Sequence, residues 1–344
     1  MNFQVVDPTG YPDWDNLIIS HPDCSFFHSS AWAKVLRDAY HYTPLYFTVF
    51  EKRKLLALMP VMEISNVLTG KRGVSLPFTD YCNPIFNEYI QFENLFNHII
   101  EYGRKRSWKY LELRSRNDLL PLMTPSTTYL LHTIDLSGGE NKTFSGFRSN
   151  TKRNIKKAIN EGLKAEILWT FDSVKEFYKL NIITRKRHGL PPQPFYFFRK
   201  VYEDIISRKF GFVVLVSYKN RIISGAVYFH LGKKALFKYG ASDENFHHLR
   251  PNNLIMWEAI KWYSLGGYES LCLGRTEPEN QGLIKFKSGW GATEKSVGYY
   301  WYNFRNKTFA SNHLKVTGFH NKIFKRMPPS LLKIAGSFFY KYAG

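Results

Sequence analysis

Cysteine is scarce in this sequence. Cys24, Cys82 and Cys272 are the only three cysteines among 344 residues. They are widely separated and odd in number, and no CxxC or other metal-ligand spacing occurs, so neither a disulfide framework nor a zinc site is expected. We therefore expect a reducing, cytoplasmic environment and no bound metal.

Long apolar runs are missing too. No uninterrupted apolar stretch approaches the roughly 20 residues that a membrane-spanning helix needs. Residues 1–16 contain no basic segment followed by an apolar run, so no signal peptide is expected. Both absences predict a cytoplasmic protein.

Several catalytic signatures are absent. The sequence contains no HExxH, GxSxG or P-loop motif and no clustered pair of carboxylates. It also lacks the Q/R-x-x-G-x-G/A segment whose amides bind the coenzyme A pyrophosphate at a helix N-terminus. The chemistry must therefore be sought in other residues.

Acidic residues are in deficit. The chain has 28 Asp and Glu but 48 Lys and Arg, a net charge of +20, which attracts nucleic acid, anionic lipid or phosphorylated intermediates. Hydrophobic content of 44% and aromatic content of 17% are ample for packed cores, and the length suits about two domains.

Helical and strand-like patterns alternate through both halves of the chain, which predicts an α/β (α+β) fold with mixed sheets. We expect two domains, residues 1–138 and 139–305, joined near Ser137-Gly138-Gly139, and a basic C-terminal tail, residues 306–344. The expected strands are 3–6, 45–50, 55–64, 110–113, 129–136, 213–217, 222–229, 236–241, 270–273 and 298–304. The expected helices are 29–39, 92–104, 150–161, 172–187, 195–208 and one that follows Asn252 or Asn253.

The stretch from Lys238 to Gly291 organises the second half. It has the pattern of strand, loop, helix, strand, loop and a final basic and aromatic segment. Because sites in α/β units lie where strands end, we expect Tyr239, Arg275 and Lys287 to lie in one cleft.

This stretch also carries a family resemblance. Tyr239-Gly240-Ala241-Ser242, Trp257-Glu258-Ala259-Ile260, Leu273-Gly274-Arg275 and Phe286-Lys287-x-Gly-Trp-Gly resemble the second half of FemAB-like transferases of the GNAT superfamily. These proteins move an aminoacyl or acyl group onto an amine, and the best known members extend peptidoglycan precursors from aminoacyl-tRNA. The Gly-Arg and Phe-Lys-x-x-Trp-Gly signatures are also similar to those of exopolysaccharide-associated members. The resemblance covers about Ser25 to Trp301 and implies two GNAT-like domains facing each other across a cleft.

The resemblance implies catalytic roles for two residues. Family members place a functional lysine at the position of Lys287, where a fixed cation would stabilise the oxyanion that forms on the attacked carbonyl. Lys285 is its rival for this role. Phe286 and Trp290 would restrict the Lys287 side chain, and Tyr239 would bind substrate or relay a proton. Alternatively, Lys287 is an ordinary surface lysine, and the aromatic residues serve only in packing.

Three further residues are candidates for substrate contacts. Arg187, three residues after Thr184, matches a family TxxR arginine that holds substrate phosphate, and Arg275 is a second candidate for anions. Asp80, in an irregular segment, would orient the amine, although capping a loop is the commoner role of Asp.

Two positions depart from the family pattern. Leu36 stands where members often carry a lysine, which weakens the case for a nucleotide-sugar substrate. Cys272 stands where members often carry an acid, and on a short apolar strand we expect an inert core thiol.

A basic segment opens the second half. Ile155, Ala158 and Ile159 form an apolar stripe at helical spacing. The polyanion-binding candidates on this helix are Lys152, Arg153, Lys156 and Lys157. A solvated surface and an anion-binding surface are both compatible with the pattern.

The tail is basic as well. From Lys295 onward the chain has nine Lys or Arg and no Asp or Glu. A helix starting near Ser330 would be apolar with flanking cations, which suits peripheral contact with the anionic inner face of a membrane. Docking on the protein itself is the alternative.

We therefore expect an acyltransferase that acts on an amine of a cell-envelope or polysaccharide precursor. The charge and the missing coenzyme A loop favour aminoacyl-tRNA as the donor, with no bound cofactor. An acyl-CoA-dependent N-acetyltransferase acting on an amino sugar or peptide is the first alternative. A non-catalytic RNA- or membrane-binding protein is the second.

Overall fold

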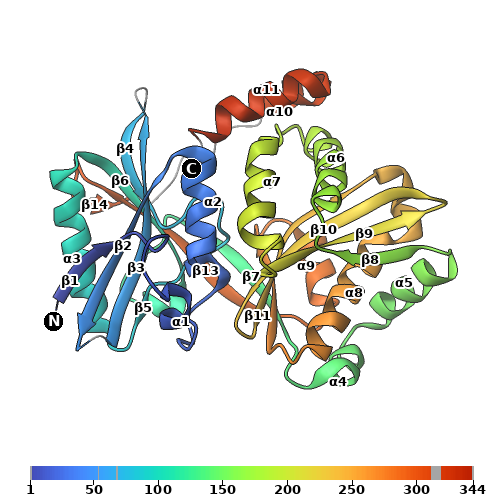
Figure 1. Ribbon diagram of the computed structural model, residues 1–344, viewed down its shortest axis with the longest axis horizontal. Helices are drawn as coiled ribbons and strands as arrows, with labels where there is room; N and C mark the ends of the chain where they lie inside the picture. The colour runs from blue at the N-terminus through green and yellow to red at the C-terminus, as the bar shows by residue number, and fades with distance from the viewer. Residues whose placement is uncertain (1, 53, 67–68, 311–318, 343–344) are drawn as a thin grey trace. The chain divides into compact units, whose positions relative to one another are not determined.

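The computed structural model describes residues 2–52, 54–66, 69–310 and 319–342. The chain divides into two compact units. The first comprises Met1–Leu130, Lys295–Lys315 and Lys341–Gly344, and the second comprises Leu131–Glu294 and Val316–Tyr340. Each unit combines strands with flanking helices, so the predicted α/β class is confirmed (Figure 1).

The first unit has strand order β1-β2-β3-β4-β6-β13, antiparallel except for the parallel pair β4 and β6. Its strands are β1 (Asn2–Val6), β2 (Thr43–Glu51), β3 (Lys54–Asn66), β4 (Gly70–Val74), β5 (Ile85–Phe86), β6 (Trp108–Arg116), β14 (Thr308–Phe309) and most of β13 (Thr293–Asn303). Its helices are α1 (Trp14–Ile18), η1 (Phe26–His28), α2 (Ser30–Tyr40), α3 (Tyr89–Lys105) and η2 (Asn117–Leu119).

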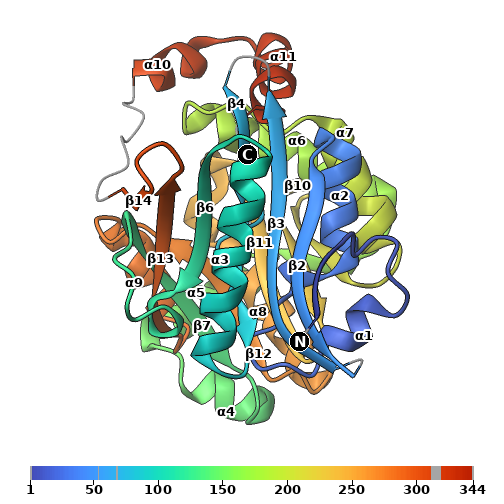
Figure 2. The same ribbon diagram turned by 90° about the vertical axis from the view of Figure 1, so that its left-hand side faces the viewer.

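Alternation along β2 gives this sheet two buried faces. Phe47 joins the core under α3, which lies in front of the strands and runs nearly parallel to them in Figure 2. Its neighbour Tyr46 points to the other face, where its ring centroid is 5.5 Å from that of Trp14.

The second unit has strand order β7-β12-β11-β10-β9-β8. Its strands are β7 (Thr127–Asp135) from Leu131 on, β8 (Lys164–Leu168), β9 (Gly211–Tyr218), β10 (Arg221–Leu231), β11 (Lys234–Ser242) and β12 (Ser270–Thr276). Its helices are α4 (Gly139–Ser145), α5 (Ser149–Asn160), α6 (Phe171–Arg187), α7 (Phe195–Val201), η3 (Tyr202–Ile206), η4 (Glu244–Leu249), α8 (Pro251–Leu265), α9 (Gln281–Ser288), α10 (Phe319–Arg326) and α11 (Pro329–Tyr340).

Helices cover both faces of β9 to β11. Phe212 and Val214 join a core with residues of α5 and α8. On the opposite face, Gly225 of β10 faces Phe177 of α6, and an added Cβ would lie 3.4 Å from its ring, in van der Waals contact. Figure 1 shows α6 and α7 on one side of these strands and α8 on the other.

The compact units divide the chain differently from the predicted limits at residues 138 and 305. The strand expected at 298–304 pairs antiparallel with β6, from Val297↔Arg116 to Asn303↔Tyr110, and therefore lies in the first unit. Residues 319–340 of the predicted tail form α10 and α11 in the second unit. Residues 311–318 and 343–344 of that tail lie outside the described residues.

Three local expectations are wrong. Neither Asn252 nor Asn253 caps α8, because the helix starts at Pro251 after Arg250 in a left-handed conformation (φ 65°). Ser137-Gly138-Gly139 is not a free linker, since α4 begins at Gly139. The loop expected before the basic and aromatic segment is partly wrong, because helix α9 (Gln281–Ser288) begins within it and continues through Lys287.

Candidate functional site

Two parallel strands of the second unit stop pairing before they end. Leu236↔Cys272 is the last pair of the β11–β12 ladder, although β11 continues to Ser242 and β12 to Thr276. β11 remains paired with β10 as far as Ser242. Beyond Leu236, the backbone edge of β11 that faces β12 is therefore outside this ladder.

Lys287 binds the end of β12. It lies on the last turn of α9, whose first turn is capped by Asn280 Oδ1 accepting from Leu283 N at 3.1 Å. Lys287 is only 5% exposed, and its Nζ donates hydrogen bonds to the carbonyl oxygens of Gly274 (2.8 Å) and Arg275 (3.0 Å). A buried ammonium needs such acceptors. Lys287 thus fastens the strand end and brings positive charge to it.

Phe286 and Trp290 pack in the core beside this lysine. Trp290 is buried, and its ring centroid lies 5.0 Å from that of Phe147 and 6.1 Å from that of Phe286. Both aromatic residues anchor the end of α9 against the core formed with α5 and α8. Lys285, the rival lysine, is exposed.

Tyr239 lies on the part of β11 beyond its ladder with β12, where the register with β10 shifts between Val227 and Tyr228. Its half-buried ring packs against α6 and α7, with centroids 5.5 Å from Phe198 and 6.5 Å from Phe177. Packing positions this ring, and its contact with substrate stays a prediction.

Arg187 lies at the end of α6 beside the end of β11. Thr184 joins the two elements, because its Oγ1 donates to Ser242 O at 3.2 Å and accepts from Ser242 N at 3.0 Å. The Arg187 guanidinium lies 4.0 Å from the Glu244 carboxylate. Burial and the charge of Arg187 both lower the pKa of His247, so this imidazole is held neutral beside the arginine.

The second unit therefore brings four of the candidates to one end of its sheet. Lys287 contacts the Arg275 backbone directly, and the Arg275 side chain is half-buried. Tyr239 lies on the neighbouring strand, and Arg187 on the helix fastened to that strand. Their convergence on one cleft stays a prediction.

Asp80 belongs to the first unit. Its segment follows two residues in left-handed conformations, Leu76 (φ 55°) and Phe78 (φ 59°), which are strained for side chains of this size. Arg114 Nη1 donates to Leu76 O at 3.1 Å, and the hydroxyl of Tyr299 donates to Asp80 O at 3.1 Å. Asp80 thus lies on a backbone held by side chains from two strands, and its role toward an amine stays a prediction.

Helix α5 matches the predicted basic helix. Ile155 and Ala158 are buried as expected, but Ile159 is 52% exposed, so the apolar stripe is narrower than predicted. Lys152 Nζ donates to Ser145 O at 2.9 Å, which ties it to the end of α4. The exposed cations of this helix are Arg153, Lys156 and Lys157.

Some features of the site have no signal in the sequence. His247 lies in the 3-10 helix η4, and its Nε2 lies 2.8 Å from Ser242 Oγ. A 3-10 helix of six residues is too short to show periodicity. Leu36 and Cys272, the two departures from the family pattern, are both buried.

Among the residues that the structure describes, no group of three or more His, Cys, Asp or Glu is placed to hold a metal ion. No helix within the described ranges is long and apolar enough to cross a membrane.

Comparison with known proteins agrees with this geometry. Residues 145–287 match the family model described as Acetyltransferase (GNAT) domain. No curated protein matches the chain. The structure of FemX is similar with a TM-score of 0.69 at 13% identity, over 86% of this chain and 96% of FemX.

Two further solved structures resemble the chain. For L-PGS from Bacillus licheniformis the TM-score is 0.56 at 10% identity, covering 92% of this chain and 98% of L-PGS. For the tandem GNAT protein from the clavulanic acid biosynthesis pathway the TM-score is 0.55 at 9% identity, covering 87% of this chain and 97% of that protein. Residues 145–287 therefore form a GNAT acyltransferase domain, in a chain with the fold of tandem GNAT structures.

Proposed function

We propose that this chain transfers an aminoacyl group from aminoacyl-tRNA to an amine of a cell-envelope or polysaccharide precursor. The observation that carries the proposal is the end of the β11–β12 ladder inside the GNAT domain, with Lys287 held at the same strand end. A strand edge that lies beyond the β11–β12 ladder suits pairing with an extended acyl donor. A fixed cation nearby suits a reaction in which negative charge develops on a carbonyl oxygen.

In the proposed reaction the acceptor amine attacks the ester carbonyl carbon of the donor. A C–N bond forms, the ester C–O bond breaks, and the proton lost by the amine ends on the leaving ribose hydroxyl. Lys287 stabilises the oxyanion, Tyr239 relays the proton, and Asp80 orients the amine. Arg187 and Arg275 bind the anionic groups of the substrates.

The donor assignment has its own support. Residues 243–250, which precede α8 beside the strand edge beyond the β11–β12 ladder, contain no glycine and include Asp243 and Glu244. A glycine-rich backbone cradle for the coenzyme A pyrophosphate is therefore missing at that helix. The exposed cations of α5 supply a surface for a polyanion instead.

The acceptor and the place of action follow from the FemAB-like resemblance and the charge. We assign the reaction to the cytoplasmic side, with peripheral contact between residues 306–344 and the inner face of the membrane. Nine cations and no acid from Lys295 onward favour such contact.

An acyl-CoA donor is the second candidate, with an amino sugar or peptide as acceptor. It is favoured by the match of residues 145–287 to a family model described as Acetyltransferase (GNAT) domain.

The test supplies the purified full chain with labelled aminoacyl-tRNA or labelled acyl-CoA, together with extracted envelope and polysaccharide precursors. Label in an alkali-stable amide from aminoacyl-tRNA alone supports the proposal. Label from acyl-CoA alone replaces the donor. No transfer from either donor, with RNA or vesicle binding retained, leaves a non-catalytic binding protein.

A further inference from the structure

Helix α11 docks on the second unit through one face. Leu332 is fully buried, and Gly336 lies so close to Pro192 that an added Cβ would be 2.0 Å from its carbonyl oxygen. The Tyr340 hydroxyl accepts from Arg185 Nη2 at 2.6 Å. The helix is therefore seated by close contacts and is not a loose end.

The opposite face of α11 is apolar and exposed. Leu331, Ile334 and Phe338 are 52%, 65% and 58% exposed and recur at i, i+3 and i+7, so they share one face. Phe339 is 49% exposed beside them. A contiguous set of large apolar side chains on a docked helix marks a contact surface.

The charge around this apolar face has one sign. Lys333 lies on α11, and Lys322, Lys325 and Arg326 are exposed on the preceding α10. Residues 295–344 contain no Asp or Glu. An apolar face with surrounding cations complements an anionic lipid surface, and a neutral apolar partner would leave the cations without a counterpart.

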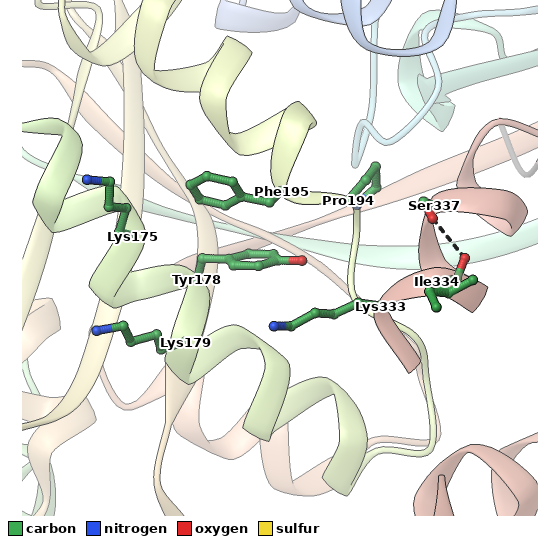
Figure 3. Close-up of a pocket in the computed structure, with 8 residues that line it drawn as sticks. All are labelled: Lys175, Tyr178, Lys179, Pro194, Phe195, Lys333, Ile334 and Ser337. Atoms are coloured by element: carbon green, nitrogen blue, oxygen red, sulfur yellow. Dashed lines mark hydrogen bonds between the residues drawn. The ribbon is translucent and has the colours of Figure 1, made fainter. Parts of the chain in front are cut away.

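A pocket of about 540 Å³ opens between α6, α7 and α11 (Figure 3). Its lining residues are Lys175, Tyr178, Lys179, Pro194, Phe195, Lys333, Ile334 and Ser337. In Figure 3 the side chain of Lys333 reaches from α11 toward α6, with the rings of Tyr178 and Phe195 beside it. The pocket is therefore lined by apolar side chains and by lysines. Ile334 belongs both to the pocket and to the exposed face of α11.

The pocket's charges remain available to an anion. Lys175 pairs with Asp172 at 2.8 Å, and Lys179 pairs with Glu176 at 2.7 Å, on the surface of α6. Such exposed pairs are weak and exchange readily. Burial raises the pKa of Tyr178 to about 12, so its hydroxyl stays a neutral hydrogen-bond donor at physiological pH.

We propose that α11 and this pocket form a binding site for an anionic phospholipid of a membrane surface. The headgroup phosphate enters the pocket against Lys333, Lys175 and Lys179, and the acyl chains lie along Leu331, Ile334 and Phe338. This deepens the proposed peripheral membrane contact, but it requires neither the donor nor the acceptor assigned above. Vesicle binding is measured without turnover, so failure here leaves acyl transfer untouched.

The test is flotation of the full chain with phosphatidylcholine vesicles, with and without phosphatidylglycerol. We expect binding only to the anionic vesicles. The triple variant Leu331→Ser, Ile334→Ser, Phe338→Ser should lose it, while Ile159→Ser, an exposed apolar residue of α5, should bind like the parent. Lys333→Gln should weaken partitioning about fivefold, and the exposed Lys164→Gln should not.

The thermal midpoint of each variant checks that it is folded. Equal binding to both vesicle types, or full binding by the triple variant, overturns the proposal. Inorganic phosphate serves as the second ligand. Saturable phosphate binding that is lost in Lys333→Gln, with no vesicle binding, would mean that the pocket takes a free phosphate and not a lipid.

Discussion

Lys287 Nζ donates a hydrogen bond to the carbonyl oxygen of Gly274 at 2.8 Å, which ties the last turn of α9 to the end of β12. The two residues belong to separate sequence motifs, Phe-Lys-x-Gly-Trp-Gly and Leu-Gly-Arg. The lysine also donates to the carbonyl oxygen of Arg275 at 3.0 Å. The same ammonium therefore supplies the positive charge and holds the end of β12 in place. Removing the ammonium therefore tests chemistry and structure together.

Lys287→Met keeps the length of the side chain and removes the ammonium. If the charge stabilises the oxyanion, turnover should fall about 100-fold to 1000-fold with little change in substrate binding. Loss of the two carbonyl contacts should also lower stability by about 1–3 kcal/mol. Steady-state kinetics well below the unfolding temperature, together with the thermal midpoint, separate the two effects.

Lys285→Met is the matched control, because Lys285 is exposed on the same helix. It should retain both stability and turnover. Equal loss in both variants would point to a general charge effect, and full activity in Lys287→Met would remove this residue from the mechanism.

The basic helix α5 offers a test of polyanion binding. Changing Lys152, Arg153, Lys156 and Lys157 to Glu should weaken binding of tRNA. Each lost phosphate contact lowers the slope of log K against log salt by about 0.7, so the slope should fall by up to about 3. Salt titrations of tRNA binding give both quantities.

The control reverses four exposed cations of the first unit, Lys52, Lys54, Arg104 and Lys109, for the same change in net charge. Equal weakening by both variants would assign the effect to net charge alone, and no change in the α5 variant would mean a merely solvated helix surface.

Gly336→Ala should loosen α11. The added Cβ would lie 2.0 Å from Pro192 O, and overpacking of this kind costs about 1–3 kcal/mol. Replacing glycine with alanine favours the helical conformation itself by about 1 kcal/mol. Faster amide exchange over residues 329–340 would therefore report lost docking and not a weaker helix. Ser337→Ala, on the exposed side of the same helix, should leave exchange unchanged. Unaltered exchange in Gly336→Ala would show that α11 is not seated on Pro192.

His28 should make stability fall in mild acid. Burial, opposed by its backbone hydrogen bonds, lowers the pKa of this histidine from 6.5 to about 4. Its Nδ1 accepts from Ser25 N at 3.1 Å, so the folded state favours the neutral ring. The unfolded chain takes up the proton below pH 6.5, and stability is therefore present above that pH and is lost as pH falls toward 4. The full contribution is about 3 kcal/mol.

Thermal midpoints measured from pH 7 to pH 4 give this slope. In His28→Gln the slope should be shallower, because the Gln amide keeps hydrogen-bonding capacity but does not titrate. Identical pH profiles for the two proteins would assign the acid sensitivity to other groups.

Local patterns in the sequence determined much of the fold. The helix expected at 172–187 is α6 (Phe171–Arg187), with Thr170 as its cap, and the strands expected at 213–217 and 222–229 lie within β9 and β10. Apolar periodicity and capping act within one turn or one strand, so they can be read without tertiary context. They also placed Tyr239 and Arg275 near the ends of strands.

The tertiary structure decided what those residues touch. The neighbours of Thr184, Lys287 and Gly336 are Ser242, Gly274 and Pro192, and no local signal names any of them. The same holds for β13, whose sequence predicts a strand but not its pairing with β6. Strand partners and the hydrogen bonds of buried charged groups depend on which chain segments meet in space. A local sequence pattern does not show which distant segment supplies the partner. The sequence therefore determined the elements and the candidate residues, whereas only packing decided that Lys287, the candidate catalytic lysine, also holds the end of β12.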